Sequence, residues 1–182
     1  MTELVEMVID SVRVHMLSSQ HVVILKESTR DRYLPIWIGP WEANAIAMRL
    51  QGSTPERPLT HDLLATILGD LKAEVRRVVI VDLARETFHA RLILVDANGN
   101  ELEIDSRPSD ALAIAVRVGA PILADAALLE RAGIQLEKPE HADEDEEERL
   151  AIFRDFVNSL ELEGGDESPE GPGPSQGPNP LE

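Results

Sequence analysis

Three short stretches of the sequence hold most of the residues that could do chemistry. The segment DSRPSD, residues 105–110, places two carboxylates, one guanidinium and two hydroxyls within six residues. Carboxylate oxygens suit Mg²⁺, and a guanidinium suits phosphate. Asp105 and Asp110 are therefore candidate ligands of a divalent metal ion, and Arg107 is a candidate phosphate contact. A turn held by an Asp–Arg ion pair would have the same composition, so this structural explanation stays open.

The second stretch, RPLTHDLL, puts His61 and Asp62 at the expected start of a helix, shortly after Arg57. Histidine can gain and lose a proton near neutral pH, so His61 is a candidate general acid or base. Its neighbour Asp62 is a second candidate catalytic residue. A histidine that hydrogen-bonds a loop at a helix start would fit the sequence equally well, and both interpretations stay open.

The third stretch, residues 40–50, repeats the pattern of residues 108–118 at an offset of 68. PWEANAIAMRL and PSDALAIAVRV share a proline at the first position, an acid at the third and an arginine near the end. An acid near a helix N-terminus and an arginine near its C-terminus both complement the helix dipole, which explains the pattern without any function. A sharper interpretation is that two equivalent helix starts present Glu42 and Asp110 around one cleft.

The elements that must position these residues are strands interrupted by proline-led helices. Alternating Val, Ile and Leu between turn residues predict the strands, and Pro at a first helical position predicts a helix start. Thr60 and Asp125 are the expected N-caps of two helices. The expected strands cover residues 4–16, 22–26, 33–39, 75–83, 88–96, 101–106 and 121–124. The expected helices cover residues 40–50, 60–71, from about 108 to 119, and from 125 to 133.

The last quarter of the chain differs in composition from the rest. We expect an acidic linker over residues 138–148 and an amphipathic helix over 149–163, with Leu150, Phe153 and Val157 on one stripe. Residues 164–182 are rich in Gly and Pro and cannot bury enough apolar surface to become ordered, so we expect a disordered tail.

Composition narrows the function classes. The chain has 182 residues and no cysteine, which excludes a disulfide framework and a thiolate nucleophile. It contains no apolar run long enough to span a membrane and no basic leader at the start, so we expect a cytoplasmic protein without a membrane partner. A net charge of −17 argues against a protein that coats nucleic acid. Residues 1–137 carry 20 acids against 14 Lys and Arg, which leaves room for a local basic site.

Taken together, YLPIWIGPWEANAIAMRLQG, RPLTHDLL and IDSRPSDALAIAVRVGAPIL resemble, in that order and spacing, the bifunctional nuclease family. The resemblance covers roughly residues 5–137 and implies one domain over residues 1–137. It implies an α+β fold, a single domain with a mixed β-sheet flanked by helices, and a nuclease that acts on both RNA and DNA. It also implies a homo-oligomer. The motif positions are Glu42, Arg57, His61, Asp62, Asp105, Arg107, Ser109 and Asp110.

Two hypotheses follow for function. In the first, the protein hydrolyses phosphodiester bonds of nucleic acid with a divalent ion, expected to be Mg²⁺, held by Asp105 and Asp110. His61, Asp62 and Glu42 would complete the catalytic set, and Arg107, Arg57 and Ser109 would bind substrate. In the second, the chain is a non-enzymatic regulatory or oligomeric protein-interaction module. The C-terminal helix would then dock a partner protein or a second subunit.

Overall fold

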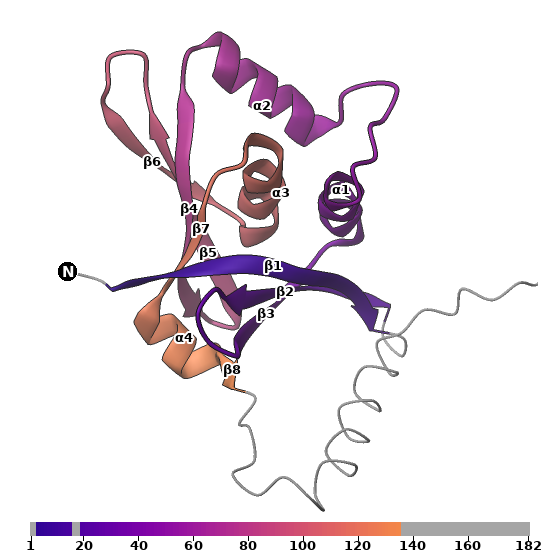
Figure 1. The fold of residues 1–182 in the computed structure, drawn as a ribbon, viewed down its shortest axis with the longest axis vertical. Coiled ribbons are helices and arrows are strands. Elements are labelled where there is room, and N and C mark those ends of the chain that lie inside the picture. Colours follow the sequence, from indigo (N-terminus) through magenta and orange to yellow (C-terminus); the bar gives the residue numbers. More distant parts are fainter. Residues whose placement is uncertain (1–2, 16–18, 136–182) are drawn as a thin grey trace, which may run out of the picture.

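One mixed sheet organises the protein. The computed structural model describes residues 3–15 and 19–135. Within them, strands lie in the spatial order β6-β5-β4-β7-β1-β2-β3-β8 (Figure 1). All neighbouring pairs are antiparallel except β4 and β7, which run parallel. The strands are β1 (Leu4–His15), β2 (Gln20–Glu27), β3 (Arg32–Ile38), β4 (Glu74–Ala84), β5 (Thr87–Val95), β6 (Glu101–Ser106), β7 (Ile122–Asp125) and β8 (Ile134–Gln135).

Helices cover the sheet unequally. Three of them, α1, α2 and α3, gather on one side, and α4 lies apart near β7 and β8 (Figure 1). The helices are α1 (Pro40–Leu50), α2 (Thr60–Asp70), α3 (Pro108–Val118) and α4 (Ala126–Ala132). The arrangement confirms the predicted α+β fold with a mixed sheet flanked by helices.

Helix α3 is the centre of the helical layer. It contacts α1, α2, β4 and β5, and every residue from Pro108 to Ala115 except Asp110 is buried. The equivalent helix α1 has the same length, but it buries only Ala43, Ala45 and Ile46. The repeated sequence therefore forms two helices of equal length in different environments, because α3 has neighbours on more sides.

Most predicted elements are present with ends within about two residues of those expected, and two further differences concern an N-cap and an additional strand. Thr60 is not an N-cap. It is the first residue of α2, and Leu59 holds the cap position, where its backbone N–H donates to the Asp62 carboxylate at 2.8 Å. Asp62, at the third helical position, thus accepts from the N-cap backbone N–H, as the acidic residue of a capping box does. Strand β8 was not predicted, since a two-residue strand has no periodicity to detect. The predicted cap by Asp125 is confirmed.

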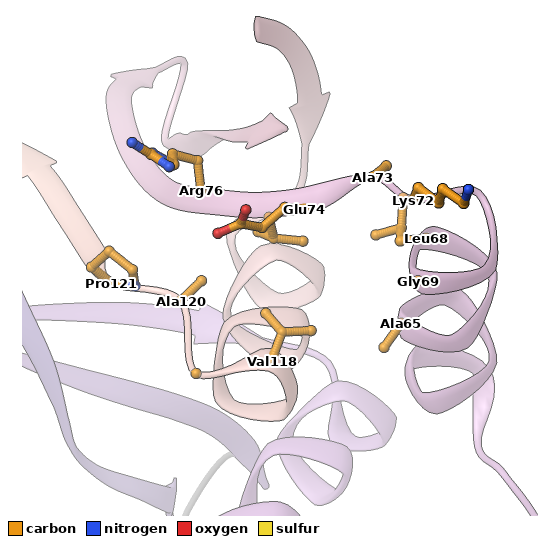
Figure 2. Close-up of a pocket in the computed structure, with 12 residues that line it drawn as sticks. Ala65, Leu68, Gly69, Lys72, Ala73, Glu74, Arg76, Val118, Ala120 and Pro121 are labelled. Atoms are coloured by element: carbon orange, nitrogen blue, oxygen red, sulfur yellow. The ribbon is translucent and has the colours of Figure 1, made fainter. Parts of the chain in front are cut away.

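Helix α2 packs on α3 by one side and leaves the other uncovered. None of its residues is buried, and Leu63, Ile67 and Leu71 at its C-cap are all exposed. Where α2 ends, a cavity of about 500 Å³ lies between α2, the start of β4 and the end of α3 (Figure 2). Its lining includes Leu68, Lys72, Glu74 and Val118, and none of the predicted site residues. This cavity is therefore not where the predicted chemistry would take place.

The predicted linker over 138–148, the helix over 149–163 and the tail over 164–182 lie outside the described residues. In the part of the chain that the structure describes, no helix has the length and hydrophobicity that crossing a membrane requires.

Candidate active site

Four predicted residues meet where α1, α2 and α3 begin. We call Glu42, His61, Arg107 and Asp110 the Arg107 cluster. Arg107 donates from Nη2 to Glu42 Oε1 at 2.7 Å, and from Nε and Nη2 to Asp110 Oδ2 and Oδ1 at 2.7 and 3.1 Å. His61 Nε2 lies 3.1 Å from Asp110 Oδ1. The two helix starts thus bring Glu42 and Asp110 together, with Arg107 between them.

Local backbone geometry explains why these side chains converge. Arg107 is the N-cap residue of α3 and has an extended backbone, so it follows directly from β6 into the helix. Asp110 and Glu42 occupy the first turns of α3 and α1, each of which begins with proline. At the N-cap of α1, a Cβ on Gly39 would lie 2.3 Å from Glu42 Oε2. Glycine at this position therefore lets the Glu42 carboxylate fold back against the backbone and reach Arg107.

Exposure differs across the Arg107 cluster. The Arg107 side chain is 67% exposed, whereas His61 is 12% exposed and Glu42 is 17% exposed. Arg107 thus faces solvent while the groups that hold it are largely covered. Its Nη1 atom donates to no acceptor among the described residues, because Nε and Nη2 make all of its hydrogen bonds there. The two N–H groups on Nη1 of Arg107 are therefore available to an anionic ligand.

The contacts within the Arg107 cluster favour the charged forms of Asp110 and Arg107. Burial opposes the charged form of Asp110, but hydrogen bonds from Arg107 and His61 and their nearby charge hold its pKa below the ordinary value of 3.8. Hydrogen bonds to Asp110 and Glu42 raise the pKa of Arg107. Asp110 is therefore a carboxylate at neutral pH, and as an acceptor it favours the His61 tautomer with a proton on Nε2.

A cavity of about 380 Å³ adjoins the cluster. Arg107, Pro108 and Ser109 line it on the α3 side, and Trp37 and His21 line it on the strand side. Ser109 is itself buried. A ligand bound to Arg107 could occupy this cavity, where it would lie next to Ser109, a predicted substrate-binding residue.

Asp62 does not join the Arg107 cluster. It accepts from Arg117 Nε at 2.6 Å, near the other end of α3, and the Arg117 side chain is only 5% exposed. Burial raises the pKa of Asp62, but the Leu59 N–H, Arg117 and the charge of Arg49 outweigh it and lower the pKa below 3.8. These groups border a separate cavity of about 310 Å³. The adjacent residues His61 and Asp62 thus contact opposite ends of α3.

Asp105 and Arg57 also lie apart from the cluster. Asp105 pairs in register with Arg91 on β5 and forms an ion pair with it, and its side chain is 74% exposed. The neighbours of Arg91 in β5, Ala90 and Leu92, belong to the core beneath α3. Because successive strand residues point to opposite faces, Asp105 faces away from the helices. Arg57 is exposed in the loop before α2 and forms no ion pair among the described residues.

The described residues do not fit the predicted Mg²⁺ site. Asp105 and Asp110 lie on opposite faces of the sheet. In residues 3–15 and 19–135, no group of three His, Asp or Glu side chains is arranged to hold a metal ion. The two carboxylates that do converge, Glu42 and Asp110, are already neutralised in part by the Arg107 guanidinium. In this geometry the guanidinium takes the position between carboxylates that a cation would need.

The sequence interpretation missed two residues at the site. Gly39 lets Glu42 reach Arg107, and Trp37, which is 55% exposed, lines the cavity next to Arg107. Strand alternation already carried a signal for Trp37, since Leu34 and Ile36 take the core face of β3 and leave position 37 on the other.

Comparison with known proteins identifies the family of this chain. A model of the bifunctional nuclease domain matches residues 23–137, which include every residue of the Arg107 cluster. Uncharacterized proteins from two Mycobacterium tuberculosis strains are 43% identical over 154 residues, which is 82% of this chain and 90% of theirs. Bifunctional nuclease 1 of Oryza sativa subsp. japonica is 25% identical over 122 residues, 65% of this chain and 37% of the rice protein. The match over most of the described chain shows that this protein belongs to the bifunctional nuclease domain family.

Proposed function

We propose that this protein is a nuclease that hydrolyses phosphodiester bonds of RNA and DNA at the Arg107 cluster. The observation that carries the proposal is the convergence of an imidazole, a guanidinium and two carboxylates at three helix starts beside a cavity. Family membership and the names of the rice relatives, which are bifunctional nucleases, support it.

In this mechanism Arg107 binds the scissile phosphate. Glu42 and Asp110 fix the guanidinium from behind, and Nη1 is left to donate to a phosphate oxygen. A fixed cationic donor stabilises the negative charge that develops on the phosphoryl oxygens in the transition state. Rigid placement matters because a flexible arginine would lose conformational entropy on binding the phosphate, and that loss would offset part of the stabilisation of the transition state.

His61 is the proposed general base. Its Nε2–H faces Asp110, which leaves the lone pair on Nδ1, and Nδ1 has no hydrogen-bond partner among the described residues. Nδ1 would take a proton from water as the water oxygen bonds to phosphorus. The phosphorus–oxygen bond to the leaving nucleotide breaks, its oxygen takes a proton from solvent, and His61 later returns the proton on Nδ1 to solvent. Asp110 remains a carboxylate throughout and stabilises the imidazolium.

We assign no step to a metal ion, because the described residues do not bring Asp105 and Asp110 together. The test uses highly purified protein and a fluorescently labelled oligonucleotide, with and without EDTA. We expect cleavage to survive EDTA and to fall by about 10²–10⁴-fold in His61→Ala. Cleavage that EDTA abolishes would overturn the metal-free mechanism. Cleavage that survives His61→Ala unchanged would point to a contaminating enzyme and overturn the proposal.

One observation favours the second candidate function, an oligomeric protein-interaction module. Leu63, Ile67 and Leu71 form an exposed apolar stripe on α2, and nothing in the described part of the chain covers it. Stripes of this kind often mark protein interfaces. A homo-oligomer that buries this stripe is compatible with a nuclease. The module becomes the preferred function if the purified protein associates but does not cleave.

A further inference from the structure

We propose that the cavity beside the Arg107 cluster is a phosphate-binding site, in which Ser109 and His21 hold the scissile phosphate together with Arg107. This inference rests on the proposed nuclease function, and it names phosphate, rather than the base or the sugar, as the part of the substrate that this cavity binds. We call the Ser109 hydroxyl, the backbone N–H groups of Ser109 and Asp110, and the His21 Nε2–H the donor pocket.

The Ser109 hydroxyl is the first argument. Ser109 is only 6% exposed, yet its Oγ forms no hydrogen bond with any described residue. This Oγ is also not one of the side-chain atoms that are sealed from solvent without a partner. It therefore keeps access to solvent, and that access leads through the cavity that Ser109 lines. A nearly buried hydroxyl that the protein leaves unbonded is available to a ligand in the cavity.

The start of α3 places backbone donors next to this hydroxyl. Arg107 is the N-cap residue without a side-chain cap, and Pro108 has no N–H. The first N–H of α3 that has a backbone acceptor is that of Ala111, which donates to the Arg107 carbonyl at 3.1 Å. The N–H groups of Ser109 and Asp110 therefore have no acceptor within residues 3–15 and 19–135. Free N–H groups at a helix N-terminus suit a phosphate.

His21 provides a donor from the strand side of the cavity. It is the second residue of β2 and lines the cavity together with Ser109 and Arg107. Its Nδ1 is sealed from solvent and has no partner. In the neutral imidazole the proton therefore lies on Nε2, because a buried N–H without an acceptor is tolerated less well than an unpaired lone pair. Nε2 is not sealed and has no partner in the described part of the chain, so its N–H is free to donate into the cavity.

Charge at the cavity favours an anion. Arg107 lines it, and the carboxylates of Asp110 and Glu42 are turned to the Arg107 guanidinium and partly neutralised by it. Glu86, in the turn between β4 and β5, is the acidic residue of the lining and opposes an anion. With the Ser109 hydroxyl donating, the donor pocket and Arg107 Nη1 offer only donors. Donors without acceptors match phosphate oxygens better than a base edge, which presents acceptors and donors together.

Recognition through phosphate accounts for a substrate range that includes both RNA and DNA. Phosphate is common to the two polymers, whereas a contact to the 2′-hydroxyl would distinguish them. The donor pocket thus agrees with the substrates of the proposed function.

Inorganic phosphate tests the donor pocket without any cleavage step. Isothermal titration calorimetry of the full chain in a phosphate-free buffer should show saturable binding of phosphate. Ser109→Ala and His21→Ala should each weaken it roughly 10- to 100-fold, which corresponds to one hydrogen bond to a charged group. Sodium chloride at the same ionic strength should give no saturable heat. Absence of saturable phosphate binding, or equal heats with chloride, would overturn the proposal.

Matched substitutions separate the donor pocket from the fold. Ser53→Ala changes a serine of a different cavity, and His89→Ala changes a histidine that does not line this one, so both should keep phosphate binding. Glu86→Gln should tighten binding roughly 2- to 5-fold, because it removes an opposing surface charge. Wild-type affinity in both Ser109→Ala and His21→Ala would overturn the donor pocket. If Ser109→Ala does not fold, wild-type affinity in both His21→Ala and Glu86→Gln would overturn it.

Cleavage is measured separately from binding. Inorganic phosphate should compete with a labelled oligonucleotide, raising its KM and leaving kcat unchanged. Phosphate binding that depends on Ser109 and His21 in a protein that does not cleave would overturn the nuclease and support the donor pocket. Cleavage by a protein that binds no phosphate would overturn the donor pocket and support the nuclease.

Discussion

The two ends of the α1–α3 helix pair use the same residue types in different ways. At the N-terminal ends, the acids Glu42 and Asp110 share Arg107, whose side chain is 67% exposed. At the C-terminal ends, Arg117 is 5% exposed and bonds Asp62. One end thus presents its guanidinium to solvent, while the other encloses it.

Hydrogen-bond partners sharpen this contrast. Arg117 divides its donors between Asp62 and the Ala113 carbonyl, and Arg49 donates to the Val116 and Arg117 carbonyls. These bonds tie α1, α2 and α3 to one another. Arg107, by contrast, keeps Nη1 unbonded within the described residues. Loss of a partner of a buried arginine destabilises the fold, whereas an exposed arginine with a remaining donor can bind a ligand.

The largest expected effect tests the exposed end. Asp110→Asn should lower the cleavage rate by about 10²–10⁴-fold, because an amide no longer provides the charge that holds Arg107 and orients His61. Initial rates on a single-stranded oligonucleotide measure it. Asp105→Asn is the matched control, since Asp105 lies on the other face of the sheet, and it should keep wild-type activity. The reverse pattern would move the active site to the β6 edge.

The next effect tests the enclosed end. Asp62→Asn should lower the free energy of unfolding by about 1.5–3 kcal/mol, because it weakens charged hydrogen bonds to buried Arg117 and to the Leu59 N–H. Urea denaturation followed by circular dichroism measures it. We expect the rate per folded molecule to stay near that of the wild type. Lost activity with unchanged stability would show that the catalytic site lies beside Arg117, in the cavity at that end.

A smaller expected effect tests whether Gly39 serves to position Glu42 or to stabilise the fold. Gly39→Ala should push the Glu42 carboxylate away from Arg107 and weaken substrate binding roughly 10-fold, about the value of one charged hydrogen bond. KM measures it. Stability should hold, because the added methyl meets only the end of a flexible side chain.

Gly133→Ala is the matched control for that substitution. A Cβ at this position would lie 2.3 Å from the Leu129 carbonyl oxygen, so backbone must move. This variant should lose stability and keep its KM once folded. An equal loss of stability in both variants would mean that Gly39 serves the fold and not the site.

The smallest effect is a dependence of stability on pH. The pKa values of Asp62 and Asp110 are lower in the folded protein than their ordinary value of 3.8, so the unfolded chain binds more protons in that range. Stability should therefore be complete above pH 3.8 and decrease as the pH falls through the lowered values. Urea midpoints measured across this range should show a shallower decrease in Asp62→Asn. An unchanged slope would remove Asp62 from the set of groups responsible.

The sequence predicted the elements well because their signals are local. Proline at the start of residues 40–50 and 108–118, and an acid two residues later, indicate helix starts without any tertiary contact. Alternation along β5 and β6 likewise predicts strands. Thr60 is wrong as an N-cap because the helical hydrogen bonds begin one residue earlier: the Leu59 carbonyl accepts from the Leu63 N–H, which makes Leu59 the cap and Thr60 the first helical residue.

The site was predicted less completely. Glu42, His61, Arg107 and Asp110 were named as candidates, and the structure brings them together. Asp105, Asp62 and Arg57 were named with them and lie elsewhere. Nearness in sequence misled for Asp105, because one residue along a strand reverses the face on which a side chain lies.

The sequence by itself determined which segments become strands and helices, and that two helices begin with the same proline and acid. Those properties depend on residues within a few positions of one another. Only the tertiary structure decided that Arg107 bonds both acids, that His61 and Asp62 reach opposite ends of α3, and that Asp105 faces away. These outcomes depend on strand register and on how α1 and α2 pack against α3, which residues distant in the chain set together.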